Sequence, residues 1–97
     1  MQKYDFTDKA EQDLEKIVNY TLKHWGKKQV KDYIDALEEA AQMLADNPDI
    51  GLNRDTLSKG LLSFPFQSHN LYYVKTSSSI TIIRILHTSM DSAKHLK

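Results

Sequence analysis

The most apolar stretch of the chain covers residues 79–87, which read Ser-Ile-Thr-Ile-Ile-Arg-Ile-Leu-His. Branched side chains at both alternating sets of positions are typical of a strand with neighbours on each side and cover on at least one face. We therefore expect this stretch to form the central strand of a sheet. Strict alternation puts its side chains on two faces. One face would carry Ile80, Ile82, Arg84 and Leu86, and the other Thr81, Ile83, Ile85 and His87.

Two earlier stretches have apolar residues at helical spacing. The first begins at Asp8, which stands at capping-box spacing from Glu11, and stops at Gly26. The second runs from about residue 28 to residue 45 and is ended by Asn47-Pro48. Because the break between them is short, they should fold back as an antiparallel hairpin. The positions expected to face inward are Ala10, Leu14, Ile17, Val18, Leu22, Trp25, Val30, Tyr33, Ile34, Leu37, Ala41 and Leu44.

The remaining segments read as strands and loops. Residues 3–7 alternate like a short opening strand, and residues 48–60 have no period and predict a crossing loop. Residues 61–66 and 70–75 then alternate as strands, with Pro65 favouring an edge position. The order β-α-α-β-β-β predicts one α+β domain over the 97 residues, with the hairpin packed on a mainly antiparallel sheet.

Composition narrows the class of protein. The absence of cysteine excludes a disulfide framework and a zinc–thiolate site. No segment resembles a signal peptide or approaches membrane-spanning length, so we expect a cytoplasmic protein without a membrane partner. Residues 1–49 hold seven Lys or Arg against eleven Asp or Glu, a balance of −4, whereas residues 50–97 hold six against two, a balance of +4. That surplus is too small to predict nucleic-acid binding by charge alone.

Arg84 is the most informative charged residue, since it interrupts an apolar strand. A guanidinium there must be paired, reach the rim of the sheet or hold a ligand. Two readings remain open at this point. The first is an intramolecular carboxylate partner, and the second is a phosphate of a bound substrate.

The C-terminal tail carries further candidates. His87, Asp91 and His95 follow at intervals of four, which on one helix would suit a metal or an acid–base pair. Because His87 is expected to end a strand, the three residues need not share one helix, and polar groups on the surface are the commoner explanation of their spacing. We expect neither a metal nor another cofactor. An RNA-cleaving site could nominally use His87 as base, Arg84 as phosphate clamp and His95 as acid.

The aromatic residues suggest packing first and binding second. Tyr72 and Tyr73 are adjacent and should point to opposite faces, so one belongs to the core and the other is free to stack on a base or meet a partner. Trp25, Tyr33 and Met43 read as packing residues. An open apolar groove between hairpin and sheet would mark a site for a partner peptide.

Several short segments share their order and spacing with a known family. They are Ala10-Glu-Gln-Asp-Leu14, Tyr20-Thr-Leu-Lys-His-Trp-Gly26, Asn47-Pro48 with Gly51 and Arg54, Gly60-Leu-Leu-Ser-Phe-Pro65, and Ile82-Ile-Arg-Ile-Leu-His87 with Met90-Asp91 and His95-Leu96. Nearly end to end, the chain resembles the ParE toxins of bacterial type II toxin–antitoxin modules, within the RelE/ParE superfamily.

That resemblance implies a RelE/ParE-like two-layer fold and a protein that poisons DNA gyrase by stabilising its cleaved-DNA state, without being an enzyme. It also implies a hetero-oligomer with a ParD-like antitoxin, and no direct sequence-specific contact with nucleic acid. The residues we assign to target binding are Arg54, Arg84, His87, Met90, Asp91 and His95. Those assigned to antitoxin binding are Leu22, Trp25, Tyr33 and Tyr73.

The sequence also departs from the family pattern. Leu62 stands where an arginine is usual, and Ser68 stands where a basic residue is common. In the ribonuclease relatives the C-terminal histidine is typically followed by a tyrosine, whereas His95 is followed by Leu96. Two alternatives therefore stay open: a RelE-like ribosome-dependent messenger-RNA endonuclease, and a non-toxic domain that only binds an antitoxin.

Overall fold

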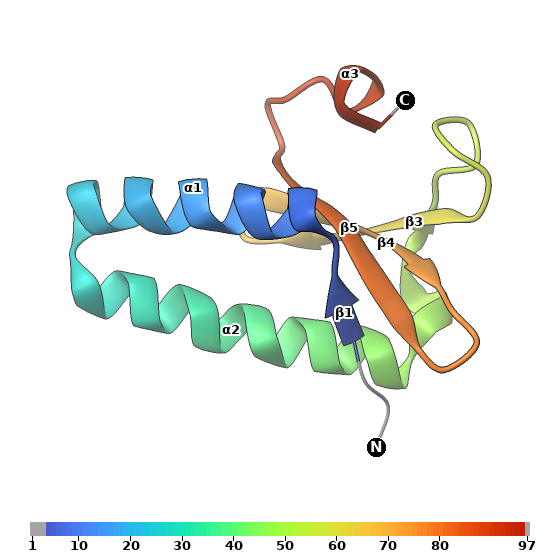
Figure 1. The fold of residues 1–97 in the computed structure, drawn as a ribbon, viewed down its shortest axis with the longest axis horizontal. Coiled ribbons are helices and arrows are strands. Elements are labelled where there is room, and N and C mark those ends of the chain that lie inside the picture. Colours follow the sequence, from blue (N-terminus) through green and yellow to red (C-terminus); the bar gives the residue numbers. More distant parts are fainter. Residues whose placement is uncertain (1–3, 97) are drawn as a thin grey trace.

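A computed structural model describes residues 4–96 and has two layers, a helical hairpin and a five-stranded sheet (Figure 1). The elements are β1 (Tyr4–Phe6), α1 (Asp8–Trp25), α2 (Lys27–Asp46), the 3₁₀ turn η1 (Pro48–Ile50), β2 (Leu52–Asn53), β3 (Leu61–Phe66), β4 (His69–Lys75), β5 (Ile80–His87) and α3 (Ser92–Leu96). The predicted α+β class is confirmed. Lys3, where we expected the first strand to start, lies outside the described residues.

The strand order is β1-β5-β4-β3-β2, with β1 parallel to β5 and the other pairs antiparallel. The apolar strand β5 has neighbours on both sides, as predicted, but β4 occupies the middle of the sheet. The segment predicted as an unstructured loop contributes β2, which pairs only with Leu62 and Ser63 of β3. Pro65 therefore lies on the part of β3 that β2 does not reach.

Strict alternation along β5 was wrong because the ladder shifts its register. Tyr72 of β4 pairs with Arg84, whereas the next residue, Tyr73, pairs with Ile82, so Ile83 has no partner opposite it. An extra residue of this kind exchanges the two faces of a strand. As a result Ile85 joins Ile82 in the core beneath the helices, and Arg84 stands opposite Tyr72 in the ladder.

The first helix begins at Asp8 as predicted, but its capping residue is Thr7 and not Asp8. The Thr7 hydroxyl accepts a hydrogen bond from the Ala10 amide at 3.1 Å and donates one to the Ile83 carbonyl at 2.7 Å, so Thr7 caps α1 and ties it to β5. Gly26 separates the helices with a φ of 89°, a region that favours glycine.

The hairpin tip is not covered by the sheet. Leu22 and Trp25, both expected to face inward, are 46% and 71% exposed. In Figure 1 the junction of α1 and α2 projects beyond the strands, so the last turn of α1 does not lie over the sheet. The helical period of these two residues is therefore correct, but there is no sheet beneath them.

Both faces of the sheet are covered. Beneath the helices lies the main core, to which Tyr73 contributes, and on the opposite face Tyr72 and Leu86 pack with Leu96 of α3. Both adjacent tyrosines are therefore buried, and the expectation that one is free for a partner was wrong. The short helix α3 was not predicted; its last apolar residue completes this second cluster. None of the helices within residues 4–96 combines the length and apolar character needed to cross a membrane.

Candidate partner-binding cleft

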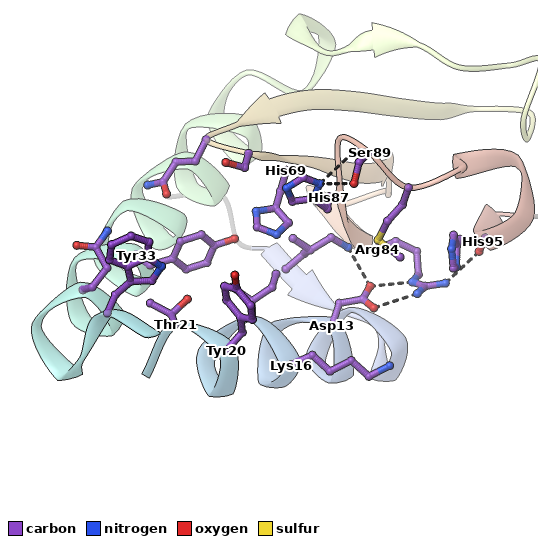
Figure 2. A pocket seen from close by; sticks show the side chains of 17 residues that line it. Asp13, Lys16, Tyr20, Thr21, Tyr33, His69, Arg84, His87, Ser89 and His95 are labelled. Carbon is purple, nitrogen blue, oxygen red and sulfur yellow. Dashed lines mark hydrogen bonds and ion pairs between the residues drawn. The ribbon is translucent and has the colours of Figure 1, made fainter. Parts of the chain in front are cut away.

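An open cleft of about 790 Å³ lies between the hairpin, the ends of β4 and β5, and the C-terminal tail (Figure 2). Its lining residues are Asp13, Lys16, Ile17, Tyr20, Thr21, Trp25, Gln29, Tyr33, Gln67, Ser68, His69, Arg84, Ile85, His87, Ser89, Met90 and His95. Segments from both ends of the chain and from its middle therefore meet here. A groove between hairpin and sheet, which we named from the sequence as the mark of a partner site, is therefore present.

At one end of the cleft, Arg84 is paired with Asp13 of α1. Arg84 Nε and Nη2 donate to the two carboxylate oxygens of Asp13 at 2.7 and 2.9 Å, a two-pronged geometry that suits a guanidinium. The two side chains are only 13% and 10% exposed. Of the two readings left open by the sequence, the structure shows the intramolecular partner.

The same pair connects three parts of the chain. Asp13 also accepts a hydrogen bond from the Ile85 amide at 3.0 Å, and Arg84 Nη1 donates to the His95 carbonyl of α3 at 3.0 Å. Hydrogen bonding to Asp13 raises the pKa of Arg84, against the lowering effect of burial. The pair thus holds α1, β5 and the C-terminal tail together.

The other end of the cleft contains buried polar atoms without partners. The Tyr33 hydroxyl and His69 Nδ1 are both buried, and neither has a hydrogen-bond partner among residues 4–96. The two rings meet edge to face with centroids 5.9 Å apart, and His69 makes a similar contact with His87 at 5.4 Å. Figure 2 shows Tyr33, His69 and His87 lying away from the Asp13–Arg84 pair.

Burial also changes the titration of these groups. It raises the pKa of Tyr33 to about 12, so the phenol stays protonated and remains a hydrogen-bond donor at physiological pH. Burial, reinforced by repulsion from His87, lowers the pKa of His69, while the negative charge of Asp13 acts in the opposite direction. His69 is consequently held towards its neutral form.

The rim of the cleft is apolar and exposed. Tyr20 and Trp25 of α1 are 62% and 71% exposed, and Met90 of the tail is 40% exposed. Large apolar side chains gathered around a cleft are typical of a surface that binds another molecule.

The cleft brings together only some of the predicted site residues. Those that line it are Arg84, His87, Met90, His95, Trp25 and Tyr33. Tyr73 is fully buried and its hydroxyl donates to the Pro48 carbonyl at 2.9 Å, so it offers no surface to a partner. Leu22 is exposed outside the cleft, and Arg54 bonds to the Ser63 hydroxyl at 2.8 Å. Asp91 accepts from the Ala93 amide at 3.0 Å in the first turn of α3.

Sequence reasoning missed His69, Asp13 and Tyr20 as cleft residues. Asp13 lies 71 positions before Arg84, and no local pattern connects them. The sequence does contain one signal for Asp13. It is a charged residue at helical spacing among apolar residues, and such a charge needs a partner.

The tail histidines do not form a shared helical face. His87 ends β5, where its Nδ1 is hydrogen-bonded to the Ser89 hydroxyl at 2.7 Å, and His95 belongs to α3. Within residues 4–96, no three His, Asp or Glu side chains cluster closely enough to hold a metal ion.

The fold and the cleft define a small α+β protein with an apolar-rimmed binding site. A family model described as the ParE toxin of the type II toxin–antitoxin system parDE matches residues 4–92. The chain belongs to this ParE toxin family.

Curated relatives agree with that assignment, and a solved structure shares the fold. The chain is 32% identical over 96 residues to Toxin ParE1 of Caulobacter vibrioides, covering 99% of each chain. It is 33% identical over 95 residues to Toxin ParE1 of Mycobacterium tuberculosis, covering 97% of each. A solved structure described as the chromosomal ParDE TA system from P. aeruginosa has the same fold, with a TM-score of 0.74 and 19% identity over 90% of this chain and 96% of that one.

Proposed function

We propose that this ParE-family toxin acts in the cytoplasm as a non-enzymatic inhibitor of DNA gyrase, stabilises the cleaved-DNA complex, and is neutralised by a ParD-like antitoxin. The observation that carries the proposal is the engagement of Arg84. Because three of its donor positions are already bonded to Asp13 and the tail, Arg84 is poorly placed to clamp a scissile phosphate. A ribonuclease built on this cleft could not use Arg84 as its phosphate clamp without breaking these bonds.

The tail is the surface we assign to the target. Arg84 fixes the tail through the His95 carbonyl, and Met90 then stands exposed beside the cleft. An exposed thioether side chain suits an adaptable protein contact better than proton transfer. The assignment of His87, Asp91 and Arg54 to the same target surface stays a prediction.

The antitoxin is assigned to the hairpin side. Trp25 offers a large exposed ring at the rim of the cleft, and aromatic anchors of this kind carry much of the binding energy in protein interfaces. Leu22 extends that surface along α1. The family description, a ParE toxin of the type II toxin–antitoxin system parDE, supports an antitoxin as partner.

The test is a supercoiling and cleavage assay with purified gyrase, ATP and plasmid, with toxin added alone or premixed with its antitoxin. We expect loss of supercoiling and accumulation of protein-linked cleaved DNA, both reversed by antitoxin. If gyrase is unaffected, the target is another one, and translating ribosomes should next be tested for messenger cleavage. Inactivity in both assays with intact antitoxin binding would identify a non-toxic binding domain.

A further inference from the structure

The buried polar atoms without partners in the cleft indicate which chemical group its occupant carries. A buried hydroxyl or ring nitrogen without a hydrogen bond has lost its hydration without compensation, which is unfavourable. Tyr33 OH and His69 Nδ1 both carry that cost, and they belong to side chains whose rings are in contact. Tyr33 is only 6% exposed, so bulk water does not satisfy its hydroxyl.

The charge around these atoms is asymmetric. Apart from the bonded pair Asp13 and Arg84, the described residues that line the cleft include one cation, Lys16, the histidines His69, His87 and His95, and no carboxylate. Because Asp13 is bonded to Arg84, its negative charge is compensated. The rest of the cleft therefore favours an anionic group over a cationic one.

We infer that the cleft takes an amphipathic acidic segment of the antitoxin, with one Asp or Glu carboxylate bound between the Tyr33 hydroxyl and His69 Nδ1. This inference rests on the proposed neutralisation by an antitoxin and names the chemistry of its anchor. A carboxylate offers only acceptors, which match the Tyr33 O–H and an Nδ1–H tautomer of His69. Lys16 of α1 also lines the cleft and adds a positive charge.

The exposed apolar side chains at the rim of the cleft would contact the apolar side chains of the bound segment. Tyr20 and Trp25 are exposed on one side of the cleft and Met90 on the other, so apolar side chains next to the carboxylate find partners there. The two polar atoms are covered in the free protein, so docking includes a local side-chain adjustment, as is common at protein interfaces.

The test measures the affinity of the full-length cognate antitoxin for Tyr33→Phe toxin. The variant keeps the ring and removes only the hydroxyl. Tyr72→Phe is the matched control, because Tyr72 is a buried tyrosine on the opposite face of the sheet. We expect Tyr33→Phe to weaken binding about 10- to 100-fold, the size of one hydrogen bond to a charged group, and Tyr72→Phe to leave it unchanged. The melting temperature of free Tyr33→Phe should not fall.

A double-mutant cycle then identifies the carboxylate. Each Asp or Glu in the toxin-binding part of the antitoxin is changed to Asn or Gln and titrated against wild-type and Tyr33→Phe toxin. One substitution should weaken binding to wild-type toxin but add little to the loss caused by Tyr33→Phe. His69→Phe should couple to the same position.

The outcomes separate this inference from the proposed function. An unchanged affinity of Tyr33→Phe toxin for the antitoxin overturns the anchor while neutralisation stands. A weakened Tyr33→Phe that couples to no acidic position overturns the carboxylate. Absence of binding between wild-type toxin and antitoxin overturns both the inference and the antitoxin half of the proposed function.

Discussion

The two ends of the cleft treat buried polar groups in opposite ways. At one end Asp13 and Arg84 bond to each other and to backbone atoms of Ile85 and His95, which offsets the cost of burying two charges. At the other end Tyr33 and His69 bury polar atoms that have no partner. The first end therefore holds the fold together, whereas the second is costly in the free protein and suited to a ligand.

The largest expected effect comes from removing the carboxylate of Asp13. Asp13→Ala leaves Arg84 buried with an uncompensated charge, and breaking a buried pair in this way costs about 3–5 kcal/mol. Urea unfolding followed by circular dichroism measures the change in the free energy of unfolding. Asp32→Ala serves as control, because Asp32 pairs with Lys28 on the exposed face of α2 and its loss should hardly change stability. Equal effects of the two variants would refute the structural role of the first end.

The next effect concerns binding rather than stability. Trp25→Ala removes the most exposed aromatic ring of the rim and should weaken antitoxin binding by about 2 kcal/mol, roughly 30-fold, with an unchanged melting temperature. Calorimetric titration measures the dissociation constant. Ile50→Ala, an exposed apolar residue on η1 outside the cleft, is the control and should bind as the wild type does. If Trp25→Ala left the affinity for the antitoxin unchanged, the rim would not be part of the antitoxin interface.

Tyr33→Phe, at the second end of the cleft, should change stability in the opposite direction to Asp13→Ala. Because it deletes a buried hydroxyl that has no partner, the free energy of unfolding of the free toxin should rise by about 1 kcal/mol. The same urea titration used for Asp13→Ala measures it. A clear loss of stability would mean that the hydroxyl is satisfied in solution, and the contrast between the two ends would disappear.

The smallest effect is a pH dependence of stability at the second end. The groups facing His69 are Tyr33 from α2, His87 from β5 and Asp13 from α1. Burial lowers the pKa of His69 below its ordinary value of 6.5, so just below that pH the unfolded chain binds more protons than the folded one. The free energy of unfolding should therefore fall as the pH drops from 6.5 towards the lower pKa of folded His69.

Replacing the ring tests this sign. In His69→Gln, stability should fall less than in the wild type as the pH drops from 7 towards the lower pKa of folded His69. Thermal unfolding at a series of pH values measures this difference. His24→Gln, on the exposed surface of α1, should keep the slope of the wild type. A slope that persists in His69→Gln would assign the pH dependence to another group.

Local pattern was enough to predict most of the elements. The capping and stop signals placed both helices within about one residue of their observed ends, and alternation located β3, β4 and β5. The need of Arg84 for a partner also followed from the sequence, because a charge on an apolar strand has few stable alternatives.

What the sequence did not reveal depends on contacts between distant segments. The unpaired Ile83 changes which side chains face the helices, and only the register with β4 decides it. The identity of Asp13 as the partner of Arg84 and the burial of His69 are likewise products of tertiary packing. The exposure of Trp25 follows from the length of the hairpin relative to the sheet, which helical periodicity does not encode.

The most direct test of the central claim compares two single variants in the gyrase cleavage assay. Met90→Ala changes an exposed apolar residue of the tail, and Leu52→Ala changes one of similar kind on the distant edge strand β2. If the tail contacts gyrase, Met90→Ala should accumulate much less cleaved complex than wild-type toxin at equal stability, while Leu52→Ala should match the wild type. Full activity of Met90→Ala, or an equal loss in both variants, would contradict the account.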